Sequence, residues 1–173
     1  LGYAWSDRIE KSIRSVLQNE AGDFEISFSA YRMDTKRKNS IAEIEQATQE
    51  ALLQINRIDP DIVIVSDDNA VKYLVVPYLL NRKTPVIFCG VNWNSEKYHL
   101  PKNQVTGMLE VQRIDHLVKE LSPYAIGDRI AFLKGDDESA RIEANEIKNK
   151  FGIPLDLRLV KNFKVWQQQY LRL

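Results

Sequence analysis

Acidic and amide side chains that follow an apolar run are the first residues in this chain that could do chemistry. Residues 62–65 (IVIV) are apolar, and Ser66, Asp67, Asp68 and Asn69 follow them directly. Such a cluster could cap a helix, because Asp is a preferred N-cap residue and a carboxylate stabilises the first helical turn. It could also line a binding site, hold a metal ion or accept a phosphoryl group. Capping and ligand binding are compatible, and both interpretations stay open here.

Two further polar loops also follow apolar runs, and aromatic residues lie in or near such loops. After residues 86–89 come Gly90, Asn92 and Trp93, and after residues 130–133 come Asp136 and Asp137. Near the amino end, Tyr3 and Trp5 stand at the start of the first predicted helix. Aromatic rings beside carboxylates suit an organic ligand with a flat ring or an ammonium group. Ordinary packing is the alternative for each aromatic ring, and helix capping is the alternative for the second acidic pair.

Several other site chemistries lack the residues that they need. His99 and His116 stand apart from other metal-binding residues, and a single cysteine, Cys89, rules out a thiolate cluster and an intrachain disulfide. Ser66 occupies the position of the acceptor aspartate in response-regulator receivers. The chain has neither a G-x-S-x-G nucleophile motif nor a glycine-rich phosphate loop. We therefore expect no metal, no cofactor and no enzymatic activity.

Composition also limits the partners. The chain has 173 residues, and its 24 basic and 24 acidic residues give a formal net charge of zero. Nucleic acids and anionic membranes call for a basic surface, so neither is expected as the main partner. One basic run, residues 32–38 (RMDTKRK), is interpreted as a solvated loop. No run approaches the roughly 18 continuous apolar residues of a membrane span.

The elements that must position these residues alternate between helix and strand. The apolar spacing and the turn residues predict both kinds of element. Helices are expected at residues 5–20, 40–57, 68–80 with a break or bend at Pro77, 114–121, 140–151 and 163–173. Strands are expected at residues 24–30, 62–65, 86–89, 130–133 and 155–159, with the apolar runs 62–65, 86–89 and 130–133 buried on both faces.

This alternation predicts an α/β fold with two small parallel sheets that are joined near residues 105–110. Ligands bind outside the carboxyl ends of the strands in open parallel sheets, so the three polar loops could meet around one cleft. The first half opens with a helix, whereas doubly wound sheets usually open with a strand, and the second half has only two strands. The chain is therefore expected to be a piece of a longer protein, without a leading strand and much of the second lobe.

The sequence resembles the substrate-binding proteins of ABC transporters that have the type I periplasmic-binding-protein fold. It is most similar to an uncharacterised subgroup that is related to tryptophan- and tyrosine-type binders. The resemblance rests on GYAWSDRIE (2–10), PDIVIVSDDNAVKYLVVPYL (60–79), PVIFCGVNW (85–93), VTGMLEV (105–111) and RIAFLKGDDES (129–139).

The resemblance implies two Rossmann-like lobes: residues 1–104, a hinge crossover at 105–110, and residues 111–173 as the beginning of the second lobe. It implies that a small organic solute, with an aromatic amino acid favoured, binds between the lobes. The implied ligand-binding residues are Tyr3, Trp5, Ser66, Asp67, Asp68, Asn69, Gly90, Asn92, Trp93, Glu110, Asp136 and Asp137.

The resemblance further implies an extracytoplasmic location, either periplasmic or as a membrane-anchored lipoprotein, and delivery of the solute to ABC permease subunits in the membrane. The alternative is an extracytoplasmic sensor domain of the same fold, which would pass the ligand signal to a kinase or cyclase output domain. A lipoprotein or signal segment alone would favour the importer, whereas a following transmembrane helix and output domain would favour the sensor.

Overall fold

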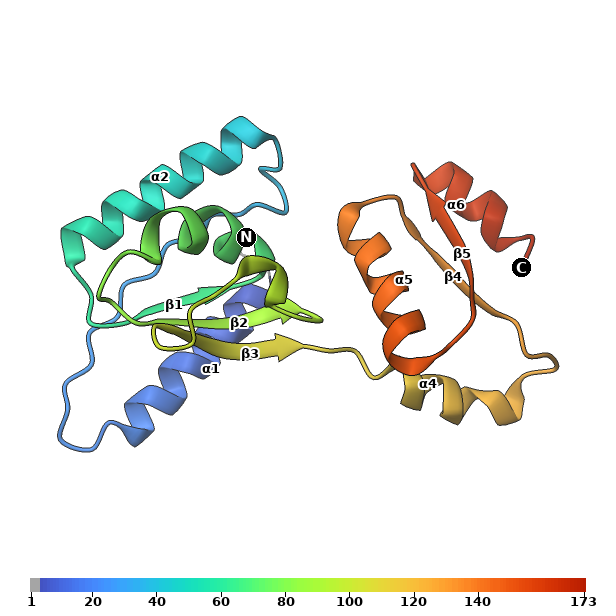
Figure 1. Cartoon of the computed structure of the whole chain (residues 1–173), viewed down its shortest axis with the longest axis horizontal. Helices are drawn as coiled ribbons and strands as arrows, with labels where there is room; N and C mark the ends of the chain where they lie inside the picture. The colour runs from blue at the N-terminus through green and yellow to red at the C-terminus, as the bar shows by residue number, and fades with distance from the viewer. Residues whose placement is uncertain (1–3) are drawn as a thin grey trace. The chain divides into compact units, whose positions relative to one another are not determined.

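The structure is a computed structural model that describes residues 4–173. The chain divides after Glu110 into two compact units. Each unit has its own small sheet, and every strand pair in both sheets is parallel (Figure 1). The predicted α/β class with two small parallel sheets is therefore confirmed, and the alternation of helices and strands is Rossmann-like.

The first unit holds a three-stranded sheet in the order β1-β2-β3. Its elements are α1 (Ala4–Glu20), α2 (Ile41–Ile58), β1 (Val63–Ser66), α3 (Asp68–Ala70), the π-helix η1 (Val71–Leu79), β2 (Val86–Asn92), the 3-10 helix η2 (Glu96–Tyr98) and β3 (Val105–Glu110). Helices α2 and η1 lie on one side of the sheet and α1 on the other (Figure 1). Residues 105–110, the implied hinge crossover, form the third strand of this sheet, and a hinge role for them stays a prediction.

The core of the first unit lies on the side of the sheet that α2 and η1 cover. Val63 and Val65 of β1 are buried there, together with Val86 and Phe88 of β2. The intervening residues face the α1 side, where Ile64 is 39% exposed. The expectation that these two strands are buried on both faces is therefore wrong. The physical reason is that α1 contributes no buried residue and leaves its side of the sheet partly open.

Helix α2 is defined by signals that are local in the sequence. The Ser40 hydroxyl accepts the backbone N–H of Glu43, and the Glu43 carboxylate accepts the backbone N–H of Ser40, which makes a capping box. At the other end, Asp59 adopts a left-handed conformation (φ 48°) and its N–H bonds to the Ile55 carbonyl. The predicted helix at residues 40–57 is confirmed within the one or two residues by which helix ends vary.

Pro77 lies inside η1 rather than at a break. The predicted helix at residues 68–80 is present as three residues of α-helix followed by nine residues of π-helix. Proline lacks an N–H and its ring clashes with the carbonyl four residues earlier. The wider turn of a π-helix moves the hydrogen bonds to a five-residue spacing, as from the Leu80 N–H to the Val75 carbonyl, and so accommodates the ring.

Residues 24–30 do not form the predicted strand. They run as irregular backbone, and no described strand hydrogen-bonds with them. Their alternation of apolar and polar residues is real, but alternation alone cannot make a strand when the neighbouring ladder is missing. Phe24 is consequently 83% exposed.

The second unit holds a two-stranded sheet, β4-β5. Its elements are α4 (Ile114–Leu121), the 3-10 helix η3 (Ser122–Tyr124), β4 (Ile130–Gly135), α5 (Glu138–Phe151), β5 (Leu155–Val160) and α6 (Phe163–Tyr170). Its core is small and centres on α5, and the buried apolar residues are Ala140, Ala144, Ile147, Ile153 and Val160. Strand β4 was expected to be buried on both faces, but none of its residues is, because this small core covers the two-stranded sheet incompletely.

Candidate functional site

The carboxyl ends of β1 and β2 bring together most of the residues that the sequence singles out in the first unit. Ser66 is the last residue of β1 and pairs in register with Cys89, immediately before Gly90. At the end of β2, Asn92 pairs with Glu110 of β3. We call this end of the sheet, from Ser66 across to Glu110, the carboxyl edge. Tyr3 lies outside the described residues.

Asp68 is the most heavily hydrogen-bonded residue of the carboxyl edge. Its carboxylate accepts the Asn92 backbone N–H at 3.0 Å, the Asn92 side-chain amide at 2.7 Å and the Tyr98 hydroxyl at 2.6 Å. The Lys97 ammonium lies 3.0 Å away. The carboxylate therefore ties the start of α3 to the end of β2 and to η2.

The electrostatics of Asp68 follow from these contacts. Its partial burial on its own would raise the pKa of the carboxyl group. The hydrogen bonds from Tyr98, Asn92 and Lys97 act in the opposite direction and prevail, so the pKa of Asp68 lies below its usual value. Asp68 is thus an ionised carboxylate whose acceptor positions are used by the chain itself.

Asp67 is placed differently. Its side chain accepts the backbone N–H of Asp68 at 2.7 Å, so Asp67 caps α3, and the capping interpretation is confirmed for this residue. Its second carboxylate oxygen lies 3.3 Å from the Lys36 ammonium. The backbone φ of Asp67 is 77°, a left-handed value that a non-glycine residue adopts at an energetic cost. Asp67 therefore combines a local cap with a charge that points toward residues 34–38.

The loop at residues 34–38 belongs to the carboxyl edge, although the sequence suggested a solvated loop. Besides the contact of Lys36 with Asp67, the Thr35 hydroxyl accepts the Asn69 side-chain amide at 3.0 Å. No local motif in the sequence marks these two contacts, because the partners in each are more than 30 positions apart in the chain. The only available signal was the basic composition of the loop, which is complementary to the acidic pair.

The tryptophans of the first unit divide between packing and the site. Trp5 is half-buried, and its ring lies so close to Gly90 that a Cβ built there would be 2.7 Å from the ring. Gly90 also has a φ of 68°, so glycine is required on both grounds. Trp93 is only 3% exposed, which supports the packing alternative for its ring. Trp5 is therefore the aromatic ring that the carboxyl edge offers to a ligand.

A cavity of about 610 Å³ extends from the carboxyl edge along β1. Trp5, Ser66 and Asp67 line one end of it. The rest of its wall comes from α1, from residues 27–38, from α2 and from the length of β1.

Cys89, on the neighbouring strand β2, is half-buried and directs its thiol to the Val65 carbonyl at 3.7 Å. Burial raises the pKa of this thiol.

The acidic pair of the second unit is engaged in local contacts. Asp137 caps α5 by accepting the Ala140 backbone N–H at 2.8 Å, which confirms the capping interpretation there. Asp136 forms an ion pair with Arg141. Both residues lie at the carboxyl end of β4, the position expected for a ligand loop in a parallel sheet.

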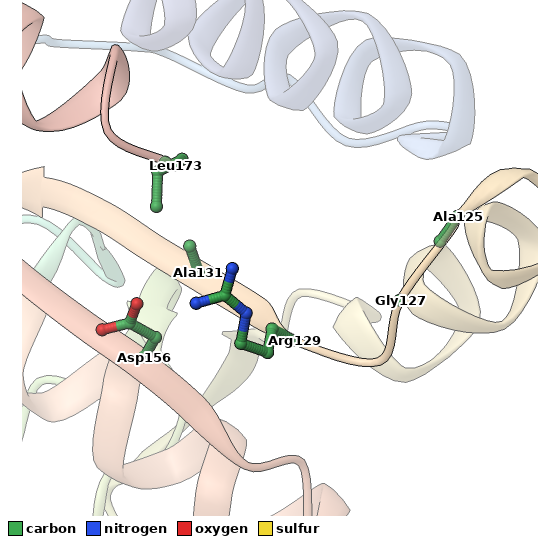
Figure 2. Close-up of a pocket in the computed structure, with 6 residues that line it drawn as sticks. All are labelled: Ala125, Gly127, Arg129, Ala131, Asp156 and Leu173. Atoms are coloured by element: carbon green, nitrogen blue, oxygen red, sulfur yellow. The ribbon is translucent and has the colours of Figure 1, made fainter.

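A smaller pocket of about 270 Å³ lies elsewhere in the second unit (Figure 2). Arg129 and Asp156 approach each other there, and the positive charge of Arg129 contributes to lowering the pKa of Asp156, behind the stronger effect of a hydrogen bond from Arg158. Arg129 precedes β4, and Asp156 is the second residue of β5. The pocket therefore lies at the amino ends of the strands, away from the usual position of ligands in parallel sheets.

Between residues 4 and 173, no group of three or more His, Cys, Asp or Glu side chains is arranged to hold a metal ion. Over the same range, no helix is both long and apolar enough to cross a membrane.

Comparison with known proteins adds no relative: no protein-family model, no curated protein and no solved structure matches this chain.

Proposed function

We propose that this chain binds a small organic solute at the carboxyl edge of its first unit, as part of an extracytoplasmic solute-binding protein. The support is structural and chemical. The first unit is an open parallel sheet, and in such sheets ligands bind outside the carboxyl ends of the strands. The chain has a cavity at that position, with aromatic, hydroxyl and carboxylate groups at its end.

One observation carries the proposal: Trp5, Ser66 and Asp67 line the same end of one cavity, although they come from α1 and from the end of β1. An indole ring offers a flat apolar face and attracts cations through its π-electrons. The Asp67 carboxylate, with Lys36 at 3.3 Å, offers a charge that a ligand ammonium group could share. The set suits a solute that combines a ring or apolar body with an ammonium group, such as an aromatic amino acid.

The wider assignment in this proposal is the type I periplasmic-binding-protein fold. Two α/β units in one chain, each with parallel strands, agree with the two-lobed arrangement that the sequence resemblance implies. On this proposal the chain is a piece of the two-lobed protein, and Asp136 and Asp137 belong to the second lobe. The solute would then be delivered to ABC permease subunits.

Isothermal titration calorimetry of the protein with the amino acids, with aromatic amines and with nucleosides tests the proposal. We expect an aromatic amino acid to bind, and Trp5→Ala to weaken its affinity by roughly tenfold or more, since a buried ring contact contributes about 1.4 kcal/mol or more. Trp166→Ala, a tryptophan substitution in α6 of the second unit, is the matched control and should leave the affinity unchanged.

A second substitution separates the charge of Asp67 from its capping role. Asp67→Asn keeps a side-chain oxygen for the cap and has nearly the same shape as aspartate, so stability should change by less than about 0.5 kcal/mol. The affinity for an ammonium-bearing ligand should fall severalfold. Asp61→Asn, at an exposed aspartate before β1, is the control. Equal affinities for both variants and the unsubstituted protein would refute a role of the Asp67 charge in binding.

A further inference from the structure

The cavity of the first unit has charged residues of both signs along its wall. Of the described residues that line it, five are basic and three are acidic. Arg14 and Arg32 form ion pairs with Glu10, at 2.8 and 2.7 Å. Arg37 forms one with Asp34 at 3.3 Å. The wall therefore carries more positive than negative charge, and this excess favours a ligand that has an anionic group.

One ion pair of this wall lies at the carboxyl edge. The Lys36 ammonium is 3.3 Å from one carboxylate oxygen of Asp67, and both residues line the cavity. The pair joins the loop at residues 34–38 to the end of β1. The side chain of Lys36 is 55% exposed and that of Asp67 is 23% exposed, so a ligand in the cavity can reach both charges.

The backbone holds the Asp67 carboxylate in this place at an energetic cost. Its φ of 77° and ψ of 157° lie in a region that residues other than glycine rarely adopt. Residues in such conformations cluster at active sites and ligand clamps, where the surrounding structure fixes them. The strain at Asp67 therefore agrees with a binding role for its carboxylate in addition to the cap of α3.

Trp5 places an aromatic ring next to this ion pair. A Cβ built on Gly90 would lie 2.7 Å from the Trp5 ring and 3.7 Å from the backbone nitrogen of Asp67. The ring and Asp67 thus surround the same point at the end of the cavity. One aromatic amino acid is long enough to contact the ring and the ion pair together.

We propose that Lys36 makes this site specific for α-amino acid zwitterions. Lys36 binds the ligand carboxylate, Asp67 binds the ligand ammonium, and the aromatic side chain lies on Trp5. An α-amino acid carries both charged groups on one carbon atom, so their spacing is similar to that of Lys36 and Asp67. The inference rests on the proposed solute site, and it names the class of solute that the site selects and the residue that selects it.

The balance of charges explains the selection. Lys36 and Asp67 together are neutral, and so is a zwitterion, so every charge in the complex has a partner of opposite sign. An amine without a carboxylate would compete with Lys36 for Asp67 and would bring two positive charges together. An acid without an ammonium would likewise compete with Asp67 for Lys36. Repulsion and loss of an ion-pair partner therefore act against both incomplete ligands.

Isothermal titration calorimetry with a matched set of ligands tests the proposal. The probes are L-tryptophan, L-tryptophanamide, which lacks the carboxylate, and indole-3-propionate, which lacks the ammonium. L-phenylalanine and its amide form a second set with a smaller ring. Titration at about pH 6 keeps the amides positively charged, because α-amino groups titrate near about 8.

Three variants accompany the unsubstituted protein. Lys36→Gln removes the charge and Lys36→Arg keeps it. Lys102→Gln changes an exposed lysine of the first unit that does not line the cavity, and it is the control. Because a solvent-exposed ion pair contributes little to stability, Lys36→Gln should fold, and thermal unfolding checks that it does. The comparison of ligands needs only the unsubstituted protein.

We expect an aromatic amino acid to bind roughly tenfold more tightly than its amide or its deaminated acid, because each of these lacks one charge-assisted contact. Lys36→Gln should weaken binding of the amino acid roughly tenfold and change the affinity for the amide by less than about twofold, so that the preference is lost. Lys36→Arg should keep most of the preference, and Lys102→Gln should keep all of it.

Two results would overturn the role of Lys36 and leave the proposed solute site standing. One is equal affinity of the unsubstituted protein for an amino acid and its amide. The other is a loss in Lys36→Gln that is the same for both ligands, which would indicate a merely structural contribution. Failure of every probe to bind would instead refute the proposed binding of aromatic solutes, and this inference with it.

Discussion

At the scale of single residues, Asp68 links charge to stability. Its carboxylate holds three donor residues from the end of β2 and from η2, and its pKa is lowered. A lowered folded-state pKa stabilises the fold above the unfolded value, near 3.9, and this stabilisation is lost as the pH falls through the folded-state pKa. Acid unfolding of this protein should therefore include protonation of Asp68.

Substitution of Asp68 tests that link. Asp68→Asn should cost about 2–3 kcal/mol at pH 7, because hydrogen bonds to a charged acceptor are lost or weakened. The cost should shrink as the pH falls through the lowered pKa of Asp68, because the unsubstituted carboxylate then becomes protonated. Urea unfolding at a series of pH values measures both effects. A cost that is the same at every pH would show that the charge of Asp68 is not what stabilises the fold.

Gly107 is a second residue with a sharp steric requirement. It pairs with Phe88 in the β2–β3 register, and an added Cβ would lie 2.1 Å from the Phe88 carbonyl oxygen. Gly107→Ala should destabilise the protein by about 1–3 kcal/mol, because backbone must shift to relieve the overlap. Gly127→Ala is the control, since nothing lies within 4 Å of its Cβ position. Thermal unfolding of the two variants compares them, and equal midpoints would contradict the register.

Residue roles could be predicted from the sequence only where the partner is close in the chain. The caps at Asp67 and Asp137 follow from an acidic residue at the start of a helix, and both are present. The partners of Asp68 lie 24 to 30 positions away. The sequence contains no signal for such pairings, because they arise only when β1 and β2 become neighbours. The same limit hid the contact of Lys36 with Asp67.

At the scale of elements, the hydrogen bond that anchors Tyr31 to Glu50 of α2 can be followed by titration. Burial raises the pKa of Tyr31 to about 12, and the hydrogen bond to Glu50 and the negative charge of Glu50 add to this effect. A raised folded-state pKa stabilises the fold below the unfolded value near 10, and this stabilisation is lost as the pH rises from about 10 toward 12. Ultraviolet difference titration of the unsubstituted protein and of Tyr31→Phe isolates this phenol. A Tyr31 that titrates near pH 10 would show that the anchor to α2 is absent.

The capping box of α2 offers a prediction at the same scale. Ser40→Ala removes the acceptor for the Glu43 N–H and should cost about 1 kcal/mol. Ser15→Ala, in an exposed position within α1, is a matched control that should be nearly neutral. Chemical denaturation measures the difference between the two variants, which should vanish if α2 does not depend on its cap.

Most elements follow from the sequence, because helices and strands with a clear period carry their own signal. The capping box placed α2, and the apolar runs placed β1 and β2. The burial of β1 and β2 was mispredicted, because a run of Val and Ile does not indicate whether helices cover one face of a strand or both. Residues 24–30 have the alternation of apolar and polar residues that is typical of a strand, but no described strand lies beside them to complete a hydrogen-bonded ladder.

At the scale of the whole molecule, the two units have separate cores. The main cluster of buried apolar residues lies entirely within the first unit, whereas Ile147 is fully buried in the second. Ile147→Ala should cost the second unit about 2–5 kcal/mol. Hydrogen exchange with mass spectrometry should show faster exchange in peptides from β4, α5 and β5, and unchanged exchange in η1. Faster exchange in both units would mean that they unfold as one.

The class of the fold was predictable at this scale, since alternating helices and strands admit few arrangements other than parallel sheets. Assignment to a family of solute-binding proteins stays a proposal, because it rests on the resemblance of five segments and on the chemistry of the carboxyl edge. Measurement of ligand binding tests this assignment directly.

The single cysteine gives this protein a natural attachment point for a spectroscopic label. Cys89 lies on β2 next to the carboxyl edge, and its raised pKa keeps the thiol protonated at neutral pH. A maleimide or an alkylating reagent should therefore react slowly at pH 7 and faster as the pH rises or as the sheet opens. Because the product carries one label at one known place, the rate of modification would report local opening of β2 without any engineered substitution.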